Sequence, residues 1–177
     1  MVSLDYISSL AEDIFHYSPV LIAIQGDPFM KSVVVYDTRF GNTEEVAKGI
    51  AKALMADIIK ASEVTISELK SYDTLVFGSP THGGNMSDGM KDLFSRMKGE
   101  SFKGKKAAAF DTKYNRSFTG SAAKKMEGKL KKLGFDIAVK PMNFFVRDQE
   151  GPLEDGELQN CEKFGKDILS KIENVGK

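Results

Sequence analysis

The sequence predicts an α/β fold, with a doubly wound parallel sheet of five strands and helices on both of its faces. Short apolar runs alternate along the chain with longer segments whose apolar residues recur at helical spacing. Several runs are apolar at every position, as expected of strands that helices cover on both faces. Their regular alternation with helices favours parallel strands joined by crossover connections.

Five segments have the composition of buried strands. Val33-Val34-Val35 and Leu75-Val76-Phe77 are the clearest, because β-branched and aromatic residues favour strands. The last segment is interrupted at Lys140-Pro141. In chain order, the expected strands cover residues 32–37, 57–60, 74–78, 106–110 and 135–146.

The segments that follow these strands carry apolar residues on one face of a helix. Gly134 ends the fourth of them, as glycine commonly does. Cys161 falls on the apolar stripe of the last one, which favours a packed thiol over a redox-active one. The helices are expected over residues 42–55, 66–69 (a single turn), 87–98, about 120–133 and 154–173. In the last helix the residues expected to face inward are Leu158, Cys161, Phe164, Ile168, Leu169 and Ile172.

Composition limits the possible functions. The chain has 177 residues, which fits one domain, and its 25 basic and 25 acidic residues give no net charge. A neutral chain favours neither nucleic acid nor an anionic membrane surface as a partner. The apolar residues 20–24 are too few to cross a bilayer, so no membrane insertion is expected. The single Cys161 excludes an internal disulfide and is compatible with a reducing cytoplasm, and no metal site is expected from the widely separated His16 and His82.

Residues 1–30 are expected to form an extension before a domain of residues 31–177. An amphipathic helix is predicted there, and it could pair two chains into a homodimer or pack on the domain. The alternative is that Met30 is the physiological start. The apolar stripe of the expected helix consists of Leu4, Ile7, Leu10, Ala11, Ile14 and Phe15.

A polar loop between the first strand and the first helix has the parts of a phosphate cradle. It offers hydroxyls, an amide, a glycine that lets the backbone come close, and N–H groups at a helix N-terminus. Neither G-x-x-x-x-G-K-[ST] nor G-x-G-x-x-G occurs here, so a monophosphate within a cofactor is favoured over a nucleotide. The alternative is an ordinary turn in which Asn42 or Thr43 caps the helix. The cradle comprises Thr38, Arg39, Phe40, Gly41, Asn42 and Thr43.

The spacing of Tyr36, Thr38, Gly41, Thr43 and Ala47 resembles the flavodoxin signature. A strand that ends in Gly-Ser-Pro-Thr, at residues 78–81, is also flavodoxin-like. The resemblance covers residues 31 to about 172. It implies noncovalent FMN, a five-stranded sheet and redox chemistry.

The resemblance also implies contacts between the flavin and two further loops. Backbone amides of the Gly-rich loop could bond the ring, and His82 replaces the aromatic residue that often stacks there. In the next loop Asp111 and Thr112 could bond the pyrimidine side of the ring, and Tyr114 or Phe118 could stack on it. Lys113 and Arg116 depart from the acidic surroundings usual in flavodoxins. The residues expected in the Gly-rich loop are Ser79, Pro80, Thr81, His82, Gly83 and Gly84.

The function expected from this resemblance is electron transfer. The chain would bind FMN, cycle between its quinone, semiquinone and hydroquinone forms, and exchange electrons with protein redox partners in the cytoplasm, without catalytic residues of its own. One alternative is an FMN-dependent NAD(P)H:quinone-type oxidoreductase, and another is a flavodoxin-like binding module that has lost its flavin. The lysines of residues 124–132 are expected to form a solvated helix face. The alternative is that they form a surface that docks an acidic redox partner.

Overall fold

The strands form one sheet in which every pairing is parallel. The computed structural model describes residues 30–116 and 120–173, so the predicted helix in residues 1–29 and Phe118 lie outside the described residues. The order is β2-β1-β3-β4-β5, and β6 also pairs with β4. The strands are β1 (Ser32–Tyr36), β2 (Asp57–Lys60), β3 (Thr74–Pro80), β4 (Lys106–Tyr114), β5 (Asp136–Ile137) and β6 (Met142–Val146).

The fifth position in the sheet is shared by β5 and β6. β5 pairs with the beginning of β4, and β6 pairs with β4 from Phe110 to Tyr114. The interruption expected at Lys140-Pro141 falls between them. The predicted doubly wound arrangement of five parallel strands is confirmed.

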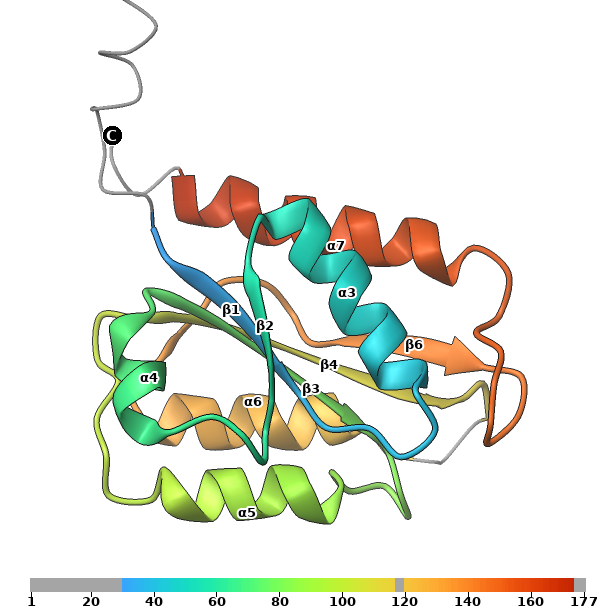
Figure 1. Ribbon diagram of the computed structural model, residues 1–177, viewed down its shortest axis with the longest axis horizontal. Coiled ribbons are helices and arrows are strands. Elements are labelled where there is room, and N and C mark those ends of the chain that lie inside the picture. Colours follow the sequence, from blue (N-terminus) through green and yellow to red (C-terminus); the bar gives the residue numbers. More distant parts are fainter. Residues whose placement is uncertain (1–29, 117–119, 174–177) are drawn as a thin grey trace, which may run out of the picture. The chain divides into compact units, whose positions relative to one another are not determined.

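Helices cover both faces of the sheet. Figure 1 shows α3 and α7 on one face and α5 and α6 on the other. No described helix is long and apolar enough to cross a membrane. The helices are α3 (Asn42–Leu54), α4 (Ile66–Ser71), α5 (Asp88–Arg96), α6 (Ala122–Lys132) and α7 (Glu157–Glu173).

Two hydrophobic cores, one on each face of the sheet, hold the layers together. Successive strand residues point to opposite faces, so Val33 and Val35 join the core under α5 and α6, whereas Val34 and Tyr36 join the core under α3 and α7. Burial of a valine side chain stabilises the fold by roughly 1.5–3 kcal/mol, which explains why these strands are apolar at every position.

Leu158 was expected to face inward, and that prediction is wrong. Its side chain is 53% exposed, whereas the neighbouring Glu157 is buried. Glu157 precedes Cys161 by one helical turn and so occupies the inward position. One residue rotates a helix by about 100°, which carries Leu158 off the buried stripe.

Strands β3 and β4 both run beyond their expected ends. The extension occurs because their polar ends pair with each other, Ser79 with Asp111 and Pro80 with Thr112. β6 supports the rest of β4 as far as Tyr114. Six residues that were predicted in loops therefore belong to strands, and their predicted loop positions are wrong: Ser79, Pro80, Asp111, Thr112, Lys113 and Tyr114.

Candidate functional site

A pocket of about 180 Å³ lies at the carboxyl ends of β1, β3 and β4. The chain leaves β1 toward β2 and returns to β3 on the other side, so the strand order reverses between β1 and β3. Ligands of doubly wound sheets bind at such a point. The pocket is lined by Thr38, Arg39, Phe40, Asn42, Thr43, Pro80, Thr81, His82, Thr112, Lys113, Tyr114, Val146 and Gln149.

The loop between β1 and α3 forms one wall. Gly41 precedes α3 with a left-handed φ of 93°, and a Cβ placed there would meet nothing within 4 Å. Its N–H donates to the Thr38 hydroxyl at 3.0 Å, which closes the loop. The open space beside Gly41 leaves the backbone of this loop accessible to a ligand.

The first turn of α3 has no side-chain cap, so the expected alternative of a cap by Asn42 or Thr43 is wrong. Among the described residues, the starts of α4, α5 and α6 are capped by the side chains of Thr65, Ser87 and Ser121. An uncapped start leaves backbone N–H groups for an outside acceptor, and the partial positive charge of the helix N-terminus favours an anion.

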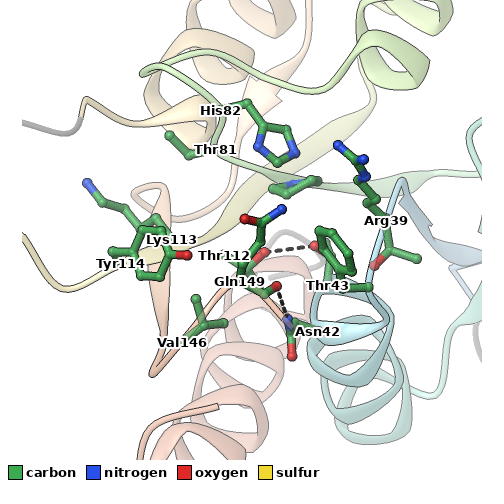
Figure 2. Close-up of a pocket in the computed structure, with 13 residues that line it drawn as sticks. Arg39, Asn42, Thr43, Thr81, His82, Thr112, Lys113, Tyr114, Val146 and Gln149 are labelled. Atoms are coloured by element: carbon green, nitrogen blue, oxygen red, sulfur yellow. Dashed lines mark hydrogen bonds between the residues drawn. The ribbon is translucent and has the colours of Figure 1, made fainter. Parts of the chain in front are cut away.

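Two side chains of this first turn have partners in other parts of the site. The Thr43 and Thr112 hydroxyls lie 2.8 Å apart, and both side chains are buried. The Asn42 amide donates to the Gln149 carbonyl at 3.3 Å. Figure 2 shows both bonds, with Lys113 and Tyr114 on one side of the pocket and Arg39 on the other.

Ser79 and Asp111 do not line the pocket. The pleat turns them toward α5 and α6, because Leu75, Phe77, Ala107 and Ala109 of the same strands point that way. Ser79 accepts from the Ser87 N–H at 2.9 Å, which ties β3 to the start of α5. The side chains of Ser79 and Asp111 therefore make their contacts inside the protein, and the predicted contacts of these two residues with the flavin stay predictions.

Asp111 links the pocket wall to the start of α6. Its Oδ2 accepts from the Thr81 and Ser121 hydroxyls, both at 2.8 Å, and from the Ala123 N–H at 3.0 Å. The other carboxylate oxygen, Oδ1, is buried and has no hydrogen-bond partner among the residues that the structure describes. Burial raises the pKa of this carboxyl, and the three hydrogen bonds and the charge of Lys113 oppose that rise. Asp111 thus positions Thr81, which does line the pocket.

Gly83 and Gly84 also lie off the pocket wall. His82 and Asn85 exchange backbone hydrogen bonds at 2.9 and 3.0 Å around the two glycines. Both glycines have positive φ, 55° and 73°, as a tight two-residue hairpin turn requires. They therefore form the turn that holds the exposed His82 at the pocket edge, and the predicted contacts of their backbone with the flavin ring stay predictions.

Sequence reasoning missed Val146 and Gln149 as lining residues. Both come from the end of β6 and the segment that follows it. The sequence could have indicated them, because a strand that pairs in parallel with β4 ends at the same edge of the sheet as β4 does. Residues at the end of such a strand are therefore expected beside the pocket. Tyr114 is held nearby, with its hydroxyl 3.4 Å from an Asp148 carboxylate oxygen and the Arg116 guanidinium 5.0 Å from its ring centre.

The donor set fits a cofactor with one phosphate and a flat ring. Hydroxyls and uncapped N–H groups gather at the phosphate loop, and Phe40, His82, Tyr114 and Val146 offer flat or apolar surface.

The comparisons with known proteins agree with this assignment. A sequence model of the flavodoxin family matches residues 34–164. The chain is 35% identical over 151 residues to the probable flavodoxin 2 of Bacillus subtilis. The aligned region covers 80% of this chain and 95% of the Bacillus protein.

Solved structures show the same fold. Oxidised flavodoxin 1 from Bacillus cereus superposes with a TM-score of 0.70 at 26% identity, covering 79% of this chain and 97% of that one. A flavodoxin from the domain Archaea gives a TM-score of 0.66 at 25% identity, covering 81% and 99%. The chain therefore belongs to the flavodoxin family, whose members bind FMN and transfer electrons.

Proposed function

We propose that this protein is an electron carrier that holds FMN in the pocket described above and exchanges electrons with other proteins. The observation that carries the proposal is the uncapped start of α3 beside Gly41, Thr38 and Thr43, at the point where the strand order reverses. When bound, FMN supplies the capacity to accept and release one or two electrons.

The side chains divide between the two ends of the cofactor. The Thr38 and Thr43 hydroxyls and the N–H groups of Arg39, Phe40, Asn42 and Thr43 would hold the phosphate, while the Gly41 N–H keeps its bond to Thr38. Pro80, Thr81, His82, Thr112 and Tyr114 line the remainder of the pocket and would border the ring. Val146 and Gln149, which lie beside them, would exclude water from one side of the ring.

The visible spectrum of the purified full chain tests the proposal. After incubation with FMN and removal of the excess, we expect a yellow protein with one FMN per chain. Anaerobic NAD(P)H should leave it oxidised, whereas dithionite should reduce it. Rapid reduction by NAD(P)H with turnover of a quinone would instead support the FMN-dependent oxidoreductase. A colourless protein that takes up no FMN would leave only the flavin-free binding module.

A cytoplasmic location, and a homodimer formed through residues 1–29, stay predictions from the sequence. Sedimentation of the full chain would decide between one chain and two.

A further inference from the structure

The surface of α6 is strongly basic. Its residues include one glutamate, Glu127, against five lysines, all of which are exposed. Lys131 pairs with Glu127 at 3.0 Å, and the Lys129 ammonium lies 5.9 Å from the Phe94 ring centre. Lys124, Lys125 and Lys132 have no carboxylate within 4.0 Å in the part of the chain that the structure describes.

The placement of two of these lysines works against the helix itself. Lys124 and Lys125 stand in the first turn of α6, which contains no acidic residue. Cations there oppose the helix dipole. The first turns of α3, α4, α5 and α7 each contain an acidic residue. The stability of α6 therefore does not account for its two leading lysines.

The start of α6 is tied directly to the pocket. The Ala122 N–H donates to the Thr81 hydroxyl at 3.0 Å, and the Lys113 ammonium donates to the Gly120 carbonyl. Thr81 and Lys113 both line the pocket. A partner that binds to the first turns of α6 would therefore lie next to the opening of the pocket.

The segment that follows β6 has the opposite charge. Residues 147–157 contain five acidic residues and one base, Arg147, which pairs with Asp155 at 2.6 Å. Gln149 of this segment lines the pocket too. The pocket thus lies between a basic helix and an acidic segment, although the whole chain carries no net charge.

We propose that the basic surface of α6, with Lys113 at its edge, docks an acidic protein that exchanges electrons with the FMN site; this rests on the proposed function. Carboxylates around the partner's redox centre would meet Lys124, Lys125 and Lys132. A long polyanion such as nucleic acid or an anionic membrane fits less well, because the acidic segment across the pocket would repel it.

Cytochrome c and its succinylated form test the charge preference, since they carry the same haem on surfaces of opposite charge. The FMN-loaded full chain is reduced with dithionite and mixed anaerobically with either ferric protein. One electron leaves the bound FMN and reduces one ferric haem to ferrous. At low salt the second-order rate should be roughly tenfold or more higher for the succinylated protein, and the two rates should converge as salt rises.

Charge reversal locates the surface. The triple variant K124E/K125E/K132E should abolish that preference. The matched control K52E/K163E/K171E changes the net charge equally with exposed lysines of α3 and α7, and it should keep the preference. Equal losses in both variants, or a preference for native cytochrome c, would overturn the proposal.

Binding to the FMN-free full chain separates this proposal from the assignment of the cofactor. Titration calorimetry at low salt should show the triple variant binding succinylated cytochrome c at least about tenfold more weakly than the parent or the control. That result stands even if no FMN is taken up. Tighter binding to duplex DNA or to phosphatidylglycerol vesicles than to succinylated cytochrome c would contradict an acidic protein partner.

Discussion

The Thr43 and Thr112 hydroxyl oxygens lie 2.8 Å apart and join the first turn of α3 to the end of β4 across the pocket. Only one of the two hydrogens can serve this bond, because each hydroxyl donates once. The other hydrogen is available to a ligand in the pocket. The pair therefore keeps both side chains in place and still offers a donor at the phosphate end of the site.

Replacing Thr43 with valine should weaken FMN binding and leave riboflavin binding almost unchanged. Valine keeps the shape of the side chain but removes a donor to the phosphate, and a hydrogen bond to a charged group contributes about 1.5–3 kcal/mol. The FMN Kd, measured by flavin fluorescence, should rise roughly 10- to 100-fold. Thr112→Val is the control, since it breaks the same pair but keeps the Thr43 hydroxyl. An unchanged FMN Kd in Thr43→Val would remove this loop from the site.

Replacing His82 with phenylalanine should lower the reduction potential of the bound FMN. His82 lines the pocket, and its imidazole N–H can donate to the reduced flavin, which carries additional negative charge, whereas phenylalanine cannot. Potentiometric titration of the FMN-loaded parent and variant measures the difference. Equal potentials in the two proteins would place His82 away from the ring.

The sheet was predictable because its strands are apolar at every position, as in Val33-Val34-Val35, and because a proline marks the break before β6. The sequence did not allow us to predict which polar residues at the strand ends face the pocket and which face the protein interior. Ser79 and Pro80 are adjacent, as are Asp111 and Thr112, but the pleat sends Pro80 and Thr112 to the pocket and their neighbours to the other face. That assignment requires knowing that both strands continue into their polar ends.

The capping of α3 shows a second limit. Asn42 and Thr43 are good capping residues by type, yet the chain enters the helix through a left-handed Gly41. Their side chains instead bond Gln149 and Thr112, which are distant in sequence. Local preference favoured only the alternative, a capped turn, and these long-range contacts exclude it.

Gly78→Ala should destabilise the protein, whereas Gly128→Ala should not. A Cβ at Gly78 would lie 2.1 Å from the Phe110 ring, which is fully buried under the pocket. Overpacking of this kind costs about 1–3 kcal/mol. Gly128 lies within α6 with nothing in contact range, so alanine there should add roughly 0.5–1 kcal/mol. Urea unfolding measures both, and equal effects would refute the packing at Gly78.

Cys161 should resist thiol reagents in the native protein. Its side chain is fully buried, as its place on the apolar stripe predicted, and burial raises the pKa of the thiol to about 12. The reactive thiolate is therefore scarce at pH 8. Labelling with Ellman's reagent should be slow in buffer and complete within minutes in about 6 M guanidinium chloride, which unfolds most domains. Rapid labelling of the native protein would contradict the packing of α7 on α3.

Asp111 should make the stability of the FMN-free protein fall as pH rises. Burial raises the pKa of this carboxyl in the folded state above its ordinary value of 3.8, so the folded state binds its proton more tightly than the unfolded state does. This stabilisation is complete when the pH is below 3.8, the ordinary pKa. It is lost as the pH rises through the higher pKa that Asp111 has in the folded state. In Asp111→Asn, which cannot titrate, this contribution is absent.

The difference in unfolding free energy between the parent and Asp111→Asn should therefore shift in favour of the variant from about pH 3.5 to pH 7, by at most about 1.4 kcal/mol per pH unit. Urea titrations at half-unit intervals measure it, and other acidic groups cancel because both proteins share them. Thr81→Val removes one of the hydrogen bonds that oppose the raised pKa, so it should steepen the dependence on pH. A difference that is constant with pH would show that Asp111 titrates alike in the folded and unfolded chain.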